Sequence, residues 1–519
     1  MIRRPALACS VAILIVGSQI ATAQSAPRSL SLEEALSLAR PASEALGLAM
    51  VGVDRARGQA LQARSELFPQ LSGSFSYARQ LKSQFDNVFG GTTADTTAPV
   101  PSGCGAFVPD PTKPLTERLA ELERAVQCPI ANPLAGFSRL PFGRKNTYTL
   151  GLAGSQVLFD GGRIFGQMKA AEAGRVSANI ALTSADAQLV LDVVQTYYDA
   201  ALSDRLLTIA EATLAQADTT LRQTQLRREV GTAPEFDVLR ARVARDNQRP
   251  ISIQARTQRD LAYVRLRQLL NLPIEGELAL STDLADTSLA KVPSLAQIAS
   301  GAPDTMPERR AAVRQAWEAV RAQQGLDAVS RSQRLPTVSL TSQYSRLGYP
   351  SKGLPSWSEF VTDWRLSLGV AVPIFTGGRI KGDRIQASAG VTEAKLRHQQ
   401  VVEAAQLDGR SALAQLEAAT SNWVASEGTA AQAARAYQIA DIRFREGIST
   451  QTELLDSRIA LQQSEANRAQ AARDFQIARV RVALLADLPL GGATSATTPA
   501  RAPARSATNQ PSTGGQSFP

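Results

Sequence analysis

The chain has 519 residues, of which 44% are hydrophobic and 5% aromatic, and this composition suits long, thin helices better than one thick core. The formal net charge is +9, but the arginines are scattered beside acidic residues, which is typical of solvated helix faces. Charge alone therefore does not indicate a nucleic-acid partner, and an exported chain is not expected to have one.

Residues 1–23 are predicted to form a secretory signal peptide. Arg3 and Arg4 precede an apolar segment from Ala6 to Ile20, and a small-x-small cleavage site follows at residues 21–23. No later stretch reaches the roughly eighteen apolar residues of a membrane helix. We therefore expect an exported chain that could span a membrane only with strands.

One stretch occurs twice, as Leu150–Gly174 and Leu366–Gly390, with a numbering offset of 216 and 11 identities. Each copy predicts a strand, a Gly-Gly turn and the start of a very long helix. The strand pattern places apolar residues on one face and small or polar residues on the other, which is typical of membrane-barrel strands. The segments around Pro69 and Pro336 also match, with a larger offset of 267, so the first repeat contains an insertion.

The first repeat is expected over residues 24–290. A helical segment begins near Leu30, is kinked or broken at Pro41 and resumes to about Phe68. The other expected elements are strands at about 70–80 and 147–159, a long helix at about 163–229 and a return helix at about 235–271. The long helix would measure roughly 100 Å, a length that a coiled coil uses and a globular core does not need.

The insertion, residues 81–146, is rich in proline, glycine and threonine. It is expected to form a loop with one short helix, from Leu115 to Val126. Cys104 and Cys128 lie in it and are the only cysteines after the signal. In an oxidising compartment they are expected to form a disulfide.

The second repeat, residues 291–490, is expected to follow the same course. Its elements are a first helix at 307–334, strands at about 337–345 and 364–375, a long helix at about 379–445 and a return helix at about 451–486. Residues 272–305 are expected to form an irregular belt. The tail, residues 491–519, is disordered by composition.

Four strands per chain cannot close a barrel, and an open edge in lipid leaves backbone groups unpaired at a cost of several kcal/mol each. Membrane barrels of this type need at least about eight strands, so the chain must oligomerise through its sheet edges. Two chains would give a barrel filled by side chains, and three would give twelve strands and room for a lumen. Small residues favour the open lumen: Gly151, Ala153, Ser155, Ser367, Gly369 and Ala371.

From Leu30 to about Leu490 the chain resembles the TolC family of outer-membrane efflux channels. The resemblance rests on the two-fold repeat, a Leu-Pro pair closing each half, and two motifs that each occur twice. These are the strand-to-helix turns, Gly161-Gly162-Arg163 and Gly377-Gly378-Arg379, and the Arg-x-x-x-Gly helix tips, Arg227–Gly231 and Arg443–Gly447.

The resemblance implies an α+β membrane protein of the Gram-negative outer membrane. It implies a homotrimer with a twelve-stranded transmembrane β-barrel, surrounded by lipid, and a long α-helical coiled-coil barrel in the periplasm. The implied partners are a periplasmic adaptor and an inner-membrane pump, in an efflux or type I secretion system for small molecules or proteins.

The resemblance also implies an acidic periplasmic aperture formed by Glu453 and Asp456. Asp237 occupies the corresponding place in the first repeat, where Arg240 replaces the second acid. Three copies of a carboxylate around a narrow pore would attract cations and respond to pH. Alternatively, these acids only stabilise the N-termini of the return helices.

The expected adaptor contacts are the helix tips, Gly231, Thr232, Gly447 and Ile448. A role of the two glycines as helix C-caps would explain their presence equally well.

An enzyme is the first alternative. The chain has one histidine, His398, expected on a solvated helix face, and no nucleophile elbow, metal-spaced cluster or phosphate loop. We therefore expect no catalytic residue, metal or cofactor. A cell-surface structural coiled-coil protein without a pore would explain the helices but not the strands, and a periplasmic adaptor would have one helical hairpin instead of two.

Overall fold

The computed structural model describes residues 28–82, 108, 110–127, 146–275, 278–284, 306–350 and 353–491. The predicted signal peptide, the Cys104–Cys128 disulfide and the predicted tail beyond residue 491 lie outside the described residues. The chain divides into two compact units. The sheet unit comprises residues 58–172 and 321–391, and the helical unit comprises the remainder.

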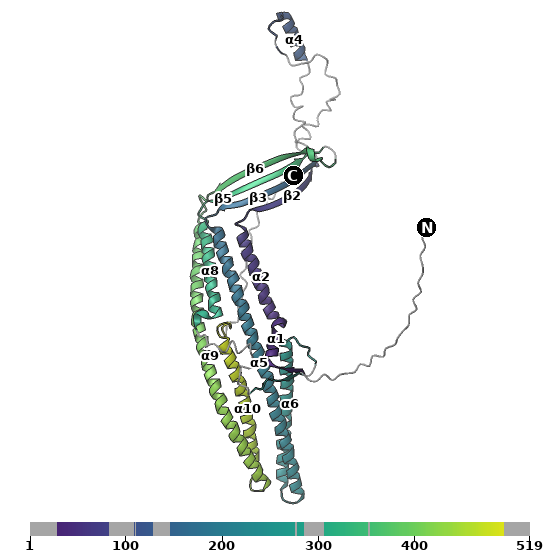
Figure 1. Ribbon diagram of the computed structural model, residues 1–519, viewed down its shortest axis with the longest axis vertical. Coiled ribbons are helices and arrows are strands. Elements are labelled where there is room, and N and C mark those ends of the chain that lie inside the picture. Colours follow the sequence, from purple (N-terminus) through teal and green to yellow (C-terminus); the bar gives the residue numbers. More distant parts are fainter. Residues whose placement is uncertain are drawn as a thin grey trace, which may run out of the picture. The chain divides into compact units, whose positions relative to one another are not determined.

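The sheet unit contains four antiparallel strands in the order β2-β3-β5-β6 (Figure 1). Their bounds are β2 Gln70–Arg79, β3 Asn146–Phe159, β5 Thr337–Gly348 and β6 Phe360–Ala371. A β-bulge between Val157 and Phe159 shifts the register of the β3–β5 pair at its end. Because β2 and β6 each have one neighbour among the described strands, the sheet has two open edges.

The predicted bounds of the last strand are wrong by four residues at each end. The strand begins at Phe360 instead of residue 364 and ends at Ala371 instead of residue 375. The apolar alternation does continue through Val372, Ile374 and Phe375, but these residues pair with no described strand. Pro373 has no N–H to donate to a ladder, which accounts for the early end.

Each strand is continuous in sequence with one long helix. The helices are α2 Glu44–Ser65 before β2, α5 Arg163–Glu229 after β3, α8 Ala311–Ser332 before β5, and α9 Arg379–Arg445 after β6. In the sheet unit α5 packs on α8 through Gly166 and Gly325, and α8 lies against α9 through Gln323 and Gly390. The helices α5, α8 and α9 therefore lie in the same order as β3, β5 and β6, the strands next to them in sequence.

The helical unit adds α1 Leu32–Ala42, α6 Glu235–Leu269 and α10 Gln451–Ala483. Its core gathers around a stretch of α5 that includes Val193, Val194 and Tyr197, all fully buried. The Tyr197 hydroxyl donates to the Leu30 carbonyl (2.9 Å) and accepts from the Thr282 N–H (3.1 Å). This tyrosine ties two extended segments to α5.

Those two segments form a short parallel pair, β1 Arg28–Leu30 with β4 Leu278–Leu280. The pair was not predicted, since residues 272–305 were expected to be irregular throughout. A three-residue strand is too short to show a period of two. A 3₁₀ turn, η3 Pro307–Arg309, precedes α8.

The predicted bounds of the two long helices are confirmed at both ends. The return helices α6 and α10 end two and three residues early. Pro41 lies in the last turn of α1 and Pro250 is accommodated inside α6. The short helix of the insertion is α4 Leu115–Gln127.

His398 is less exposed than the expected solvated helix face implies. Its side chain is partly buried, and its ring lies edge-on to Trp317 at a centroid distance of 5.6 Å. No helix among the described residues combines the length and the apolar character needed to cross a membrane.

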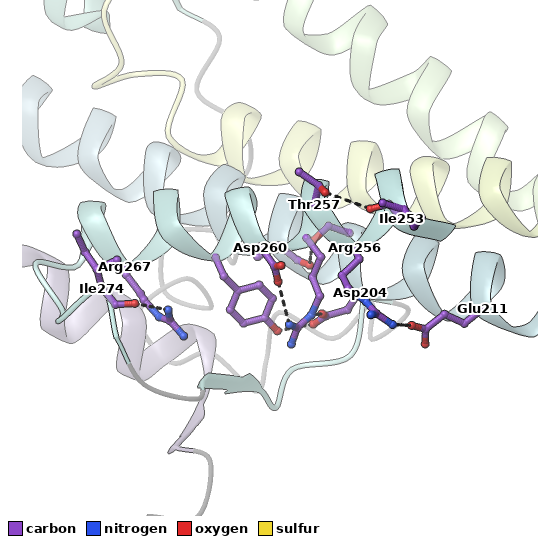
Figure 2. A network of polar contacts seen from close by, with 12 residues as sticks. Asp204, Glu211, Ile253, Arg256, Thr257, Asp260, Arg267 and Ile274 are labelled. Carbon is purple, nitrogen blue, oxygen red and sulfur yellow. Dashed lines mark hydrogen bonds and ion pairs between the residues drawn. The ribbon is translucent and has the colours of Figure 1, made fainter. Parts of the chain in front are cut away.

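Ion pairs join α5 to α6 along the hairpin (Figure 2). Asp204 accepts from the Arg259 Nε at 2.7 Å and from the Tyr263 hydroxyl, and Glu211 accepts from Arg256 at 2.8 Å. Asp204 and Glu211 are seven residues apart, the heptad spacing of one coiled-coil seam. Burial, followed by the contact with Asp204, raises the pKa of Tyr263 well above its usual value, so this hydroxyl remains a donor.

Candidate functional site: the sheet faces and the helix tips

The sheet has an apolar face. The strand register gathers apolar side chains of all four strands on one face, on which Ser342 and Arg346 of β5 also lie. We define this face by Leu71, Phe75, Tyr77, Leu150, Leu152, Tyr344, Trp364, Leu366, Leu368 and Val370. On β6 these side chains are 62–72% exposed. An exposed apolar area of this extent marks contact with lipid or with another protein, so the predicted alternation of the strands is confirmed.

The opposite, polar face consists mostly of small and neutral side chains. We define it by Ser72, Ser74, Ser76, Gly151, Ala153, Ser155, Ser339, Thr341, Gln343, Ser367, Gly369 and Ala371. Asp363 and Arg365 lie on the same face and form an ion pair at 2.9 Å. This face can therefore contact water without a net charge of its own.

Aromatic side chains gather near the loop end of the sheet, where β2 ends and β3 begins. Tyr77 and Tyr148 have ring centroids 4.8 Å apart, and Tyr344 and Trp364 meet edge-on at 6.4 Å. Belts of aromatic residues are typical of the level at which a membrane strand leaves the hydrocarbon.

The strand-to-helix turns need their glycines. Gly161 and Gly162 have φ angles of 67° and 90°, and the corresponding angles of Gly377 and Gly378 are 56° and 89°. Residues other than glycine rarely adopt φ angles in this left-handed region. In the first turn the buried Asp160 carboxylate also accepts from the N–H groups of Gly162 (3.0 Å) and Ile164 (2.8 Å), which caps α5.

The arginine of each turn contacts the residue that follows the preceding first helix. Arg163 pairs with Glu66 at 3.0 Å, and Arg379 donates to the Gln333 side chain at 3.1 Å. Glu66 and Gln333 occupy equivalent positions in the two repeats. The Gly-Gly-Arg motif was predicted as a turn, and its second role, holding the turn to the preceding helix, was not.

The helix tips end in glycine caps. Gly231 and Gly447 have φ angles of 81° and 74°. The following N–H groups, of Thr232 and Ile448, each bond to a carbonyl five residues earlier at 2.8 Å, as in a Schellman motif. The caps account for the glycines, and the exposed side chains of Thr232 and Ile448 remain available for contact.

The two hairpin tips are bound to each other. The Arg227 guanidinium donates to the main-chain carbonyls of Phe444 (3.1 Å) and Arg445 (2.8 Å) and lies 4.8 Å from the Phe444 ring centroid. Arg240 donates to the Thr452 hydroxyl. Arg227 belongs to the Arg-x-x-x-Gly motif of the first repeat, but its partners belong to the second repeat and the sequence does not reveal them.

The predicted aperture acids lie at the starts of the return helices. Glu453 and Asp456 are exposed, one turn apart on α10, and Asp237 is partly buried in the first turn of α6. The Glu453 carboxylate lies 3.4 Å from the Arg443 guanidinium. Its N–H donates to the Thr450 hydroxyl, which caps α10.

The first turns of α6 and α10 lie side by side. With its amide oriented to satisfy both atoms, the buried Gln451 donates to the Asp237 carbonyl and accepts from the Ala241 N–H, both at 3.2 Å. Within the described part of the chain, no cluster of histidine, cysteine or acidic residues could hold a metal ion.

Residues 120–272 and 302–486 match the family described as Outer membrane efflux protein. The chain is 28% identical over 283 residues to the toluene efflux pump outer membrane protein TtgF of Pseudomonas putida, covering 51% of this chain and 55% of TtgF. It is 26% identical over 318 residues to the outer membrane protein OprJ of Pseudomonas aeruginosa, covering 58% and 62%. The chain thus spans about half the length of the curated relatives it matches.

Solved structures share the fold over more of the chain. The Campylobacter jejuni CmeC outer membrane channel has a TM-score of 0.66 at 16% identity, covering 94% of this chain and 95% of CmeC. CusC has a TM-score of 0.65 at 19% identity, covering 87% and 91%. These likenesses confirm the fold of long helices joined to antiparallel strands. The family match covers more than half of the chain. The protein therefore belongs to the outer membrane efflux protein family, whose members lie in the Gram-negative outer membrane and are not enzymes.

Proposed function

We propose that three copies of this chain form the outer-membrane exit channel of an efflux pump. The observation that carries the proposal is the two-faced sheet with two open edges. In a barrel of three sheets the apolar faces would contact lipid, and the polar faces would line a twelve-stranded lumen.

The energetics support closure by further copies. Each unpaired backbone group of an open edge in lipid costs several kcal/mol, and both β2 and β6 present such edges. The small side chains of the polar face, such as Gly151 and Gly369, leave space where larger ones would fill a narrow barrel. This favours three copies over two.

Small organic compounds are the cargo that we propose. The names of two relatives mention toluene and antibiotics, and the polar face, whose Asp363 and Arg365 offset each other, would pass cargo of either charge. A passive channel needs an energy source, so we propose an inner-membrane pump and a periplasmic adaptor as partners.

The helix tips are the proposed adaptor contact. Besides the caps at Gly231-Thr232 and Gly447-Ile448, they carry exposed apolar side chains, with Val230, Phe236 and Ile448 each about two-thirds exposed or more. A cluster of apolar side chains on an otherwise polar hairpin is what a docking partner would cover.

Glu453, Asp456 and Asp237 are the proposed aperture. The Glu453 carboxylate already lies beside the Arg443 guanidinium, so Glu453 contributes less to the electric field of a pore than Asp456 does. We therefore propose Asp456 as the main determinant of cation preference at the entrance.

Charge added inside the lumen tests the function. Ser367 and Leu366 are neighbours on opposite faces of β6, so each is changed to cysteine and treated with a cationic methanethiosulfonate during planar-bilayer recording. We expect Ser367→Cys channels to lose conductance for cations and Leu366→Cys channels to keep theirs. Equal responses would contradict the assignment of the faces, and an absence of pores would favour a surface coiled-coil protein.

A further inference from the structure

The helix of the insertion, α4, carries an apolar stripe that nothing in the described chain covers. Its large apolar side chains recur at intervals of four, three and four residues, as Leu115, Leu119, Leu122 and Val126. Each of them is between 42% and 74% exposed. A continuous apolar stripe on a helix whose other face is charged is a surface that another group covers.

The intervals of this stripe are those of a coiled-coil seam. Alternating steps of four and three residues repeat an apolar side chain every 3.5 residues on average, which is the pattern of the core positions a and d. In α4, Leu115 and Leu122 then occupy d positions, and Leu119 and Val126 occupy a positions. The flanking e and g positions are Thr116, Arg118, Glu123 and Ala125.

The two charged residues at these flanking positions complement each other between helices. In a parallel coiled coil, a g residue of one helix faces the e residue of the following heptad on its neighbour. This arrangement brings Arg118 of one α4 beside Glu123 of the next. Neither side chain forms an ion pair with another described residue, and the Arg118 Nε is buried without a hydrogen-bond partner. By contrast, Glu121 on the outward side pairs with Lys113 at 2.7 Å within the chain.

The topology of the sheet allows the α4 helices of three copies to meet. The insertion leaves the sheet at Arg79 and re-enters it at the paired Asn146, at the end away from α2 and α5. A barrel of twelve strands, spaced about 4.8 Å apart and tilted by about 40°, has a radius of about 12 Å. The shorter connection to α4, residues 128–145, can span up to about 60 Å. Copies related by rotation about the barrel axis would run parallel along it.

A second copy of α4 fits this apolar face better than a lipid surface does. Helices that lie on a membrane carry mainly lysine and arginine on their polar face and often a large aromatic residue on the other. In α4 there are three glutamates, two arginines and no aromatic residue. A helix of 13 residues is also marginal in water by itself, so burial against a partner would stabilise it. Tethering three copies to one barrel raises their effective concentration, which favours association through only two heptads.

We propose that the α4 helices of three copies form a parallel coiled coil at the extracellular end of the channel. The apolar stripe forms its core, and Arg118 of each copy pairs with Glu123 of the next. The proposal rests on the proposed three-copy channel and adds a contact that involves neither the sheet nor the long helices. It also gives a role to the insertion, which the first repeat has and the second repeat lacks.

Cysteine cross-linking tests the seam in the full-length, detergent-purified complex. Leu122 occupies a core position and Ala120 an outward position, and both are exposed within one chain. We expect oxidation to link Leu122→Cys copies in pairs, with the third copy of each complex left unlinked. Ala120→Cys is the matched control, expected to link no more than the unmodified protein, which accounts for the native cysteines. Equal yields from the two variants would overturn the proposed seam.

Charge reversal in the Leu122→Cys protein tests the parallel pairing. Arg118→Glu would place two carboxylates opposite each other between copies, and Glu123→Arg would place two guanidinium groups opposite each other. Each change alone is therefore expected to reduce the yield of linked pairs, and the two changes together are expected to restore it. Single changes without effect, or a double change that restores nothing, would overturn the pairing of Arg118 with Glu123.

The outcomes separate this proposal from the channel itself. A complex with the mass of three chains that does not link through Leu122→Cys would overturn the coiled coil and leave the channel standing. Protection of Leu122→Cys from a membrane-impermeant maleimide in lipid vesicles, but not in detergent, would assign the stripe to lipid and would also overturn the coiled coil. A monomeric mass for the unmodified protein would overturn both proposals.

Discussion

The glycine contact between α5 and α8 gives the sharpest prediction about stability. We expect Gly166→Ala to destabilise the protein and Gly174→Ala, eight residues along the same helix, to stabilise it. An added Cβ at Gly166 lies 2.7 Å from a carbonyl oxygen and 3.0 Å from the Val329 backbone nitrogen, whereas one at Gly174 meets nothing within 4 Å.

The magnitude follows from two opposing effects. Alanine is better than glycine in a helix interior by about 1 kcal/mol, and both substitutions gain this. At Gly166 two of the three nearest obstructing atoms are backbone and the third is Val329 Cγ2 at 2.9 Å, so α5 and α8 must move apart. Forced overpacking of this kind costs about 1–3 kcal/mol, and a rigid backbone favours the upper end, so we expect a difference between the two variants of about 2–3 kcal/mol.

The measurement is thermal loss of helical circular dichroism for the two variants in one detergent at one protein concentration, because assembly contributes to apparent stability. The melting temperature of Gly166→Ala is expected to fall below, and that of Gly174→Ala to equal or exceed, that of the unmodified protein. A Gly166→Ala variant as stable as Gly174→Ala would refute the close crossing.

Three further predictions concern the helical unit. Burial raises the pKa of the Asp192 carboxyl in the folded protein. The stability that the protonated carboxyl contributes is therefore present below the unfolded-state pKa and is lost as pH rises through the higher folded-state pKa. Asp192→Asn should raise the melting temperature at neutral pH and not at acidic pH. Arg227→Met removes two hydrogen bonds between the hairpin tips, worth about 1.5–3 kcal/mol each for a charged donor. We expect it to raise the open probability of the channel in bilayers. An unchanged open probability would show that these bonds do not hold the tips closed. Asp456→Asn should lower the ratio of cation to anion permeability more than Glu453→Gln does, and the reverse order would show that Arg443 leaves Glu453 fully effective.

The long helices were predictable because glycines mark both of their ends. Gly162 and Gly378 precede the first turns, and Gly231 and Gly447 follow the last ones. All four have positive φ angles, so the sequence signal and the backbone requirement coincide. The two faces of the sheet followed from a period of two, which needs no knowledge of the partner strands.

The features that the sequence did not predict involve residues far apart in the chain or segments too short to show a pattern. The alternation through Val372 and Ile374 suggested four more residues of β6, but a pattern cannot show that no described strand pairs there. The three-residue pair β1–β4 is too short for any period. The contact of His398 with Trp317 and the bonds from Arg227 to α9 join residues far apart in sequence, and these become visible only when the helices are packed.

The central claim is that one chain supplies a third of a pore. The most direct test is the mass of the purified, unheated complex, corrected for bound detergent. The account predicts three chains per complex, which would give twelve strands and an open lumen. A monomer would leave both sheet edges unpaired and would contradict the claim, and a dimer would contradict it because eight strands enclose a barrel filled by side chains.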